Sequence, residues 1–238
     1  MEDTYKILIA AAVGFAIAPL SDLLKSKISS HLTKRKLITK LKLSIRILES
    51  SIPILNETVI KREHYIGTNY KKLQPVTFVN PPFFLPNIES DIENCYNILS
   101  ENEKKLLHIA LPFNEHIKTY ENKITKYQDD HRDFTHEKYT VNKADISSEH
   151  IKKETDNCYK RIISVEKALL YTTICLHEIL KNASSNSLQL ATDEEILRKS
   201  EAELGLTLDL SWWSIPNSPY AVVEFDIDPT INETNENL

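Results

Sequence analysis

The chain has 238 residues, of which 41% are hydrophobic and 26% charged, and its formal net charge is −5. This length and composition fit one ordinary domain with extensions and exclude a mainly disordered chain. Only three glycines are present, which argues against a phosphate-cradling loop and against hairpin-rich β folds. The many Leu, Ile, Lys and Glu residues instead predict long helices and an all-α fold.

The first 24 residues carry the strongest single pattern. Every residue from Ile7 to Leu20 is apolar, small or proline. As a helix this stretch would be ~21 Å long, which is short against a hydrocarbon core of ~30 Å, and flanking apolar residues can extend it. We therefore expect residues 1–24 to form an N-terminal transmembrane anchor. Its anchoring side chains would be Ile7, Leu8, Ile9, Val13, Phe15, Ile17 and Leu20.

Two other interpretations of this segment remain. A cleaved signal peptide would begin with a basic leader, whereas residues 1–6 are net acidic. A buried helix of the globular body would have a similar length. The small residues Ala10, Gly14 and Ala18 recur at every fourth position. That spacing allows helices to approach closely in lipid, but an alanine-rich anchor also explains it.

The charges that flank the segment predict its orientation. Lys6 alone precedes the span, whereas seven basic residues follow it between Lys25 and Lys42. Because positive residues stay on the cytoplasmic side, we expect a single pass through the cell inner membrane, with the N-terminus outside and the C-terminus cytoplasmic.

Residues 25–70 would form a basic juxtamembrane region and the first long helix. The cations expected to bind anionic lipid headgroups are Lys25, Lys27, Lys34, Arg35 and Lys36. A plain solvated helix face is the alternative. Nucleic acid is disfavoured as a partner because the basic stretch from Lys25 to Arg46 has no aromatic residue to stack on bases.

Apolar residues at alternating spacings of three and four predict three long helices, packed as an antiparallel three- to four-helix coiled-coil-like bundle. The first would run from Leu32 to about Ile66, with a kink at Pro53. The second would start at a capping box formed by Ser100 and Glu103, and the third would span residues 148 to about 180. The three stripes are Leu37, Leu41, Ile45, Leu48, Ile52, Leu55 and Val59; Leu106, Ala110, Phe113, Ile117, Tyr120, Ile124 and Tyr127; and Cys158, Ile162, Val165, Leu169, Thr172, Leu176 and Ile179.

Residues 71–187 would hold the rest of the bundle. Its proline-rich start, residues 71–87, is rich in apolar residues, so we expect an ordered loop packed on the helices. A short helix over 88–99 would follow, and a loop over 182–187 would close the unit. The residues expected on one face of the short helix are Ile88, Ile92, Cys95, Tyr96 and Leu99.

Residues 188–225 would form a C-terminal cover. A capping box of Thr192 and Glu195 predicts a helix that ends near Gly205, followed by irregular or β segments around Trp212 and Trp213. The acidic, Asn-rich residues 226–238 lack a core pattern, so we expect them to be disordered.

The candidate chemistry is weak. Asp129–His136 holds three aspartates and two histidines, types that can bind a metal or act in acid–base catalysis. However, His131 and His136 are five residues apart, which does not place them on one helical face. The favoured interpretation is a solvated loop, and the polar stretch from Gln128 to Lys143 could also be an exposed extension of the second helix. His108, His116 and His177 are expected to be packing residues. The three cysteines form no CxxC pair, and we expect Cys95, Cys158 and Cys175 to be small buried apolar residues in a reducing compartment.

These patterns predict no catalytic, cofactor-binding or metal site, so we expect that the protein is not an enzyme. The favoured role is a membrane-anchored, cytoplasm-facing helical protein that binds another protein or self-assembles. One alternative is a membrane-permeabilising effector of a bacterial toxin or anti-phage defence system, since the abundance of Lys, Ile and Asn is typical of bacterial or phage proteins. The other is an enzyme that uses the Asp129–His136 cluster as a metal site.

Overall fold

The computed structural model describes residues 2–66, 78, 80–81, 83–136, 148–185 and 192–208, and of residues 2–22 it describes only the backbone. The described residues form five α-helices and one short 3-10 helix, with no strand among them. The expected all-α fold is thereby confirmed. The predictions of strands or an irregular cover around Trp212 and Trp213, and of a disordered tail over 226–238, concern residues outside those that the structure describes.

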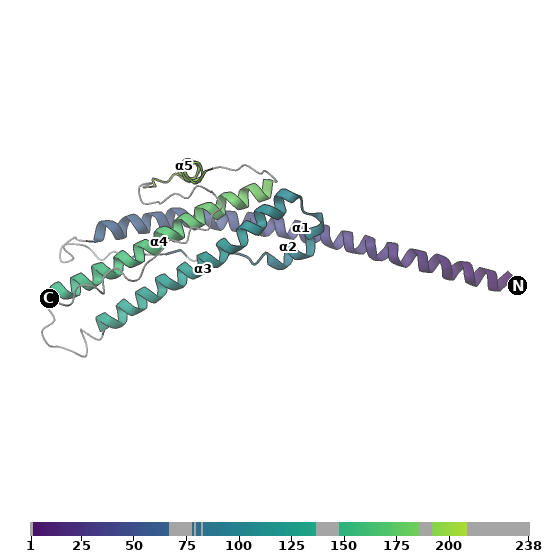
Figure 1. The fold of residues 1–238 in the computed structure, drawn as a ribbon, viewed down its shortest axis with the longest axis horizontal. Coiled ribbons are helices and arrows are strands. Elements are labelled where there is room, and N and C mark those ends of the chain that lie inside the picture. The colour runs from purple at the N-terminus through teal and green to yellow at the C-terminus, as the bar shows by residue number, and fades with distance from the viewer. Residues whose placement is uncertain are drawn as a thin grey trace.

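Helix α1 (Glu2–Tyr65) is a single helix of 64 residues, ~96 Å long at 1.5 Å per residue. It joins the expected anchor, the basic region and the first bundle helix without a break, because the sequence holds neither glycine nor proline between Leu20 and Ile52. Figure 1 shows its N-terminal part leaving the bundle as an isolated rod. Within the residues that the structure describes, no helix is long and apolar enough to cross a membrane, and the side chains from Ile7 to Leu20 lie outside that description.

Three long helices make the bundle. Helix α3 (Glu101–His136) runs in the same direction as α1, and helix α4 (Ser148–Ser185) returns between them and packs on both (Figure 1). The predicted stripes of α1, α3 and α4 meet in one core. Nearly every stripe residue is buried; Ile45, Tyr127 and Cys158 are partly exposed. The helical bundle was therefore predictable from spacing, and within it α4 alone of the three long helices runs antiparallel to the other two (Figure 1).

Shorter elements close the bundle at the end where α1 enters. Helix α2 (Glu89–Cys95) and the 3-10 helix η2 (Tyr96–Ile98) lie against α1. In the preceding loop, Pro81 and Phe83 are buried, whereas Phe84 is 81% exposed, so the expected packing holds for only part of the residues described there. Helix α5 (Asp193–Leu204) lies across α4 (Figure 1).

Both predicted capping boxes are present. The backbone N–H of Glu103 donates to the Ser100 hydroxyl at 3.1 Å, and the Ser100 N–H donates to the Glu103 carboxylate at 2.7 Å. Thr192 and Glu195 make the same reciprocal pair at the start of α5, and Gly205 ends that helix in the left-handed conformation with φ of 64°. These local signals fix helix boundaries as capping chemistry predicts.

Helix α1 continues through Pro53, because the neighbouring Ile52 is fully buried in the bundle and its packing outweighs one missing hydrogen bond. Two other local predictions were wrong. The expected loop over 182–187 begins later, since α4 continues to Ser185, whose hydroxyl donates to the Lys181 carbonyl within the helix. Tyr96 is half exposed because α2 tightens into η2 at that residue, and the ammonium of Lys104 lies 4.8 Å from its ring centroid.

Candidate functional site

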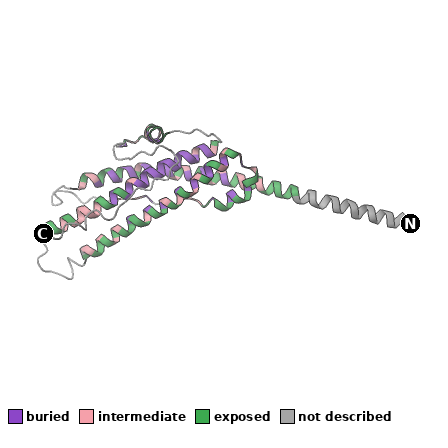
Figure 2. Ribbon diagram, viewed as in Figure 1, coloured by how far each residue is buried: buried purple, intermediate pink, exposed green. Residues whose placement is uncertain are grey.

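The projecting part of α1 is the first candidate site. All side chains from residue 23 to residue 29 are exposed, and Figure 2 shows this stretch beyond the bundle. Three large apolar side chains in it are about three-fifths exposed, Leu23 at 62%, Leu24 at 60% and Ile28 at 59%, and Leu32 just beyond it is 59% exposed as well. Burying one such side chain is worth ~1.5–3 kcal/mol, so this stretch has a strong tendency to leave water.

The expected headgroup cations divide into two groups. Lys25, Lys27 and Arg35 are exposed, and none of them forms an ion pair among the described residues. Lys34 is instead half-buried, with its ammonium 2.8 Å from the Glu103 carboxylate. Lys36 is exposed, but its ammonium lies 3.3 Å from Asp91.

The second group, Lys34 and Lys36, holds neighbouring elements onto α1. Lys40 joins Lys36 on the buried Asp91 of α2 and also donates to the Asn87 carbonyl at 2.6 Å. Burial acts to raise the pKa of Asp91, but the two ammonium groups outweigh it and keep that pKa below its usual value. Burial is likewise outweighed at Glu103, whose pKa the Lys34 ammonium lowers. Lys34, Lys36 and Lys40 therefore serve the fold, and the α1 cations that lack an ion pair among the described residues include Lys25, Lys27 and Arg35.

A buried ion pair joins α1 to α4 near the far end of the bundle. Arg62 and Glu166 are 2% and 0% exposed, and the guanidinium donates twice to the carboxylate, at 2.9 Å each. The guanidinium carbon lies 4.2 Å from the Phe78 ring centroid and 5.3 Å from that of Tyr159. Burial raises the pKa of Glu166, and the guanidinium opposes that rise. Sequence reasoning missed this pair, although Arg62 stands three residues after Val59, at the next core position of the α1 stripe.

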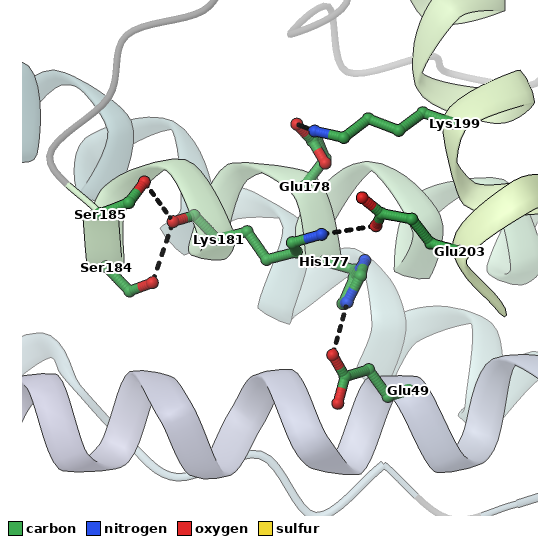
Figure 3. Close-up of polar contacts among 8 residues, drawn as sticks. All are labelled: Glu49, His177, Glu178, Lys181, Ser184, Ser185, Lys199 and Glu203. Atoms are coloured by element: carbon green, nitrogen blue, oxygen red, sulfur yellow. Dashed lines mark hydrogen bonds and ion pairs between the residues drawn. The ribbon is translucent and has the colours of Figure 1, made fainter.

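A polar cluster lies where α1, α4 and α5 meet (Figure 3). His177 is 1% exposed, and its Nε2 is 3.5 Å from the Glu49 carboxylate on α1. Burial lowers the pKa of His177, while Glu49 acts to raise it. On the α5 side, Lys199 pairs with the buried Glu178 at 2.6 Å, and Lys181 pairs with Glu203. As expected, His177 is a packing residue, and the two crossed ion pairs fasten α5 to α4.

The Asp129–His136 cluster forms the exposed end of α3. Its Arg132 pairs with Asp129 at 3.0 Å, and the ring of His131 lies 6.0 Å from that of Tyr159. Burial lowers the pKa of His131. No group of three or more His, Cys, Asp or Glu placed to hold a metal occurs among the described residues. The cluster is helical rather than a loop, and its residues do not converge.

The remaining candidates are the three cysteines and a pocket beside α3. Cys95 and Cys175 are buried, Cys158 is partly buried, and all three are free thiols; burial raises the pKa of Cys158 to about 11. A pocket of 480 Å³ lies between residues 83–89 and α3, with His108 in its lining. Its lining contains no Ser, Thr or Cys that a histidine could activate. The outer side of α1 therefore combines exposed cations with exposed apolar side chains.

Comparison with protein-family models, with curated proteins and with solved structures found no match for this chain.

Proposed function

We propose that this protein is held in the cell inner membrane by the N-terminal part of α1 and presents its helical bundle to the cytoplasm, where the bundle binds another protein or self-assembles. One observation carries the proposal: α1 leaves the bundle as an exposed helix that bears Leu24, Ile28 and Leu32 at about 60% exposure. An isolated apolar helix is costly in water and favourable in lipid. The unbroken apolar sequence from Ile7 to Leu20 precedes it directly.

The length of the projecting helix fits this arrangement. Along the described part of α1, the first hydrogen bond to the rest of the bundle is donated by the Ser30 hydroxyl to the Asn94 carbonyl at 3.4 Å. Ser30 is ten positions beyond Leu20, which corresponds to ~15 Å of helix. Lys25 and Lys27 would lie ~8–10 Å beyond Leu20, within reach of the headgroup layer, which is ~5–7 Å thick on each side of the bilayer.

Flotation with vesicles tests the proposal. The full chain should float with phosphatidylcholine vesicles and remain bound in alkaline carbonate, whereas an Ile9→Lys, Val13→Lys double variant should stay in the supernatant. Two buried lysines oppose insertion by ~5–7 kcal/mol on insertion scales. Lys25→Gln with Lys27→Gln is the matched control, because it keeps the apolar stretch and should change only the preference for anionic lipid. A full chain that fails to float, or that floats equally well with the two lysines, would overturn the proposal.

The expression phenotype separates the proposed role from the permeabilising alternative. An anchored binding protein should leave dye entry unchanged when it is expressed. Growth arrest with dye entry that disappears on deletion of residues 1–24 would favour an effector that opens the membrane.

A further inference from the structure

The outer side of α1 carries a second surface, farther from the membrane than Lys25 and Lys27. It includes Arg35, which the charge pattern alone had grouped with the headgroup cations, and Leu32. We define the α1 outer strip as the exposed residues Leu32, Arg35, Lys42, Leu43 and Arg46. At 100° per residue they fall within an arc of ~100°. The buried positions of the same helix, among them Leu41 and Leu48, fall on the opposite side. The strip is therefore turned away from the bundle.

The strip is both apolar and cationic. Leu32 is 59% exposed and Leu43 is 50% exposed. Arg35, Lys42 and Arg46 are exposed, and the ion pairs of the described residues include none of them. Between residues 23 and 48 the sequence has eight Lys and Arg and no Asp or Glu. Three of these cations are engaged by Asp91 and Glu103, so within the described part of the chain the outer strip keeps the uncompensated charge.

We propose that the α1 outer strip docks an acidic amphipathic helix of a partner protein. Such a helix has an apolar stripe that would cover Leu32 and Leu43, and flanking carboxylates that would pair with Arg35, Lys42 and Arg46. The strip is ~21 Å long from Leu32 to Arg46, which matches about four turns of the partner. This inference names the partner class for the proposed binding role and rests on the proposed anchoring.

Distance from the membrane argues against lipid as the occupant. Arg35 is 15 residues beyond Leu20, and Arg46 is 26 residues beyond it. Because α1 is one continuous helix, a perpendicular span would carry these charges ~22 and ~39 Å past the end of the apolar stretch. Both distances exceed the headgroup layer and the screening length of ~8 Å at physiological salt.

Like charge argues against a second copy of this chain. Two copies anchored in one membrane with the same orientation would run parallel, so each strip would face an identical strip. Arg35, Lys42 and Arg46 would then oppose their own equivalents, and like charges across an interface are unfavourable. An antiparallel pair would relieve the repulsion but would require one copy to insert from the other side.

The test uses the full chain in nanodiscs of neutral phosphatidylcholine and a synthetic fluorescent peptide of 21 residues that has a leucine stripe flanked by glutamates. Leu43→Gln and Arg46→Gln should each weaken peptide binding about tenfold, or ~1.4 kcal/mol. The matched controls are Ile54→Gln and Lys61→Gln, which change an exposed apolar residue and an exposed cation farther along α1. These controls should stay within about twofold, and circular dichroism should show the same helix content in all four variants.

Several results would overturn the docking proposal. A scrambled peptide of the same composition, or a double-stranded oligonucleotide, could bind as tightly as the amphipathic peptide, which would leave only nonspecific charge. The Arg46→Gln variant could lose affinity for anionic vesicles as strongly as Lys25→Gln, which would indicate lipid. Sedimentation could show a dimer that Leu43→Gln dissociates, which would indicate a second copy. If the chain does not float with vesicles, the anchoring proposal fails separately, and peptide binding is then measured in buffer.

Discussion

The buried Arg62–Glu166 pair gives the sharpest stability prediction. Replacing Arg62 with Met keeps much of the side-chain volume but removes the guanidinium that donates both 2.9 Å hydrogen bonds to Glu166. It also removes the cation from above the Phe78 ring. The Glu166 carboxylate, which is fully buried, would then have lost its charge partner.

The expected loss of stability is large because both side chains are buried away from water. Removing one partner of a buried ion pair destabilises a protein by ~3–5 kcal/mol, whereas replacing both partners with apolar residues is often neutral or stabilising. Arg62→Met should therefore cost ~3–5 kcal/mol, and the double variant Arg62→Met, Glu166→Leu should recover most of it. Lys61→Met removes the neighbouring exposed pair with Glu57 and should cost less than ~1 kcal/mol.

The destabilisation caused by Arg62→Met should also depend on pH. Burial already raises the pKa of Glu166, and losing the guanidinium would raise it further. A raised carboxyl pKa means that the folded state binds more protons than the unfolded state, so stability from this group falls as pH rises. The penalty of Arg62→Met should therefore shrink as pH is lowered from 7 towards 5.

Urea unfolding followed by circular dichroism at 222 nm, with all variants in the same detergent micelles, measures these differences. An Arg62→Met penalty below ~1 kcal/mol, or a penalty that grows at lower pH, would refute the reasoning. A double variant no more stable than the single variant would show that the two side chains matter mainly through packing.

Four smaller predictions follow from other sites. Burial lowers the pKa of His177, so stability should fall as pH drops below ~6.5, the unfolded value, and His177→Gln should reduce that loss in urea titrations at pH 7.5 and 5. Gly205→Ala should cost ~1–2 kcal/mol in the same unfolding assay, because φ is 64° and no atom lies within 4 Å of the added methyl group, so only backbone strain acts. Ser100→Ala should cost ~1 kcal/mol, because it removes the cap on the Glu103 N–H, and Ser50→Ala on the exposed face of α1 should change little. Cys158, with its pKa raised to about 11, should react with Ellman's reagent far more slowly in the folded chain than in urea; equal rates would contradict its burial.

The sequence predicted the parts of the fold that local rules control. Alternating spacings of three and four placed Leu48, Ile117 and Leu169 in one core, because a helix turns each stripe to one side. The cap at Thr192 was equally predictable, because its partner Glu195 is three residues away. The continuity of α1 through Pro53 depended on packing against α4, which no local rule contains.

The candidate site was less predictable because its chemistry is non-local. Arg62 and Glu166 are 104 residues apart, and the local sequence around each residue does not indicate the other as its partner. In the sequence, Lys34 cannot be told apart from its basic neighbour Arg35. In the structure, Lys34 is turned towards Glu103, 69 residues later. Which cations remain free on α1 could be determined only once the helices were placed side by side.

The depth of residue 13 in a bilayer tests the central claim most directly. The full chain carries a nitroxide label at Val13→Cys, with the partly buried Cys158 replaced by Ala, and is reconstituted in vesicles; Ser50→Cys on the exposed face of the bundle is the control. Membrane anchoring predicts that oxygen relaxes the label at residue 13 strongly while a water-soluble nickel chelate does not, and that residue 50 shows the reverse. Equal access of the nickel chelate to both labels would contradict the account.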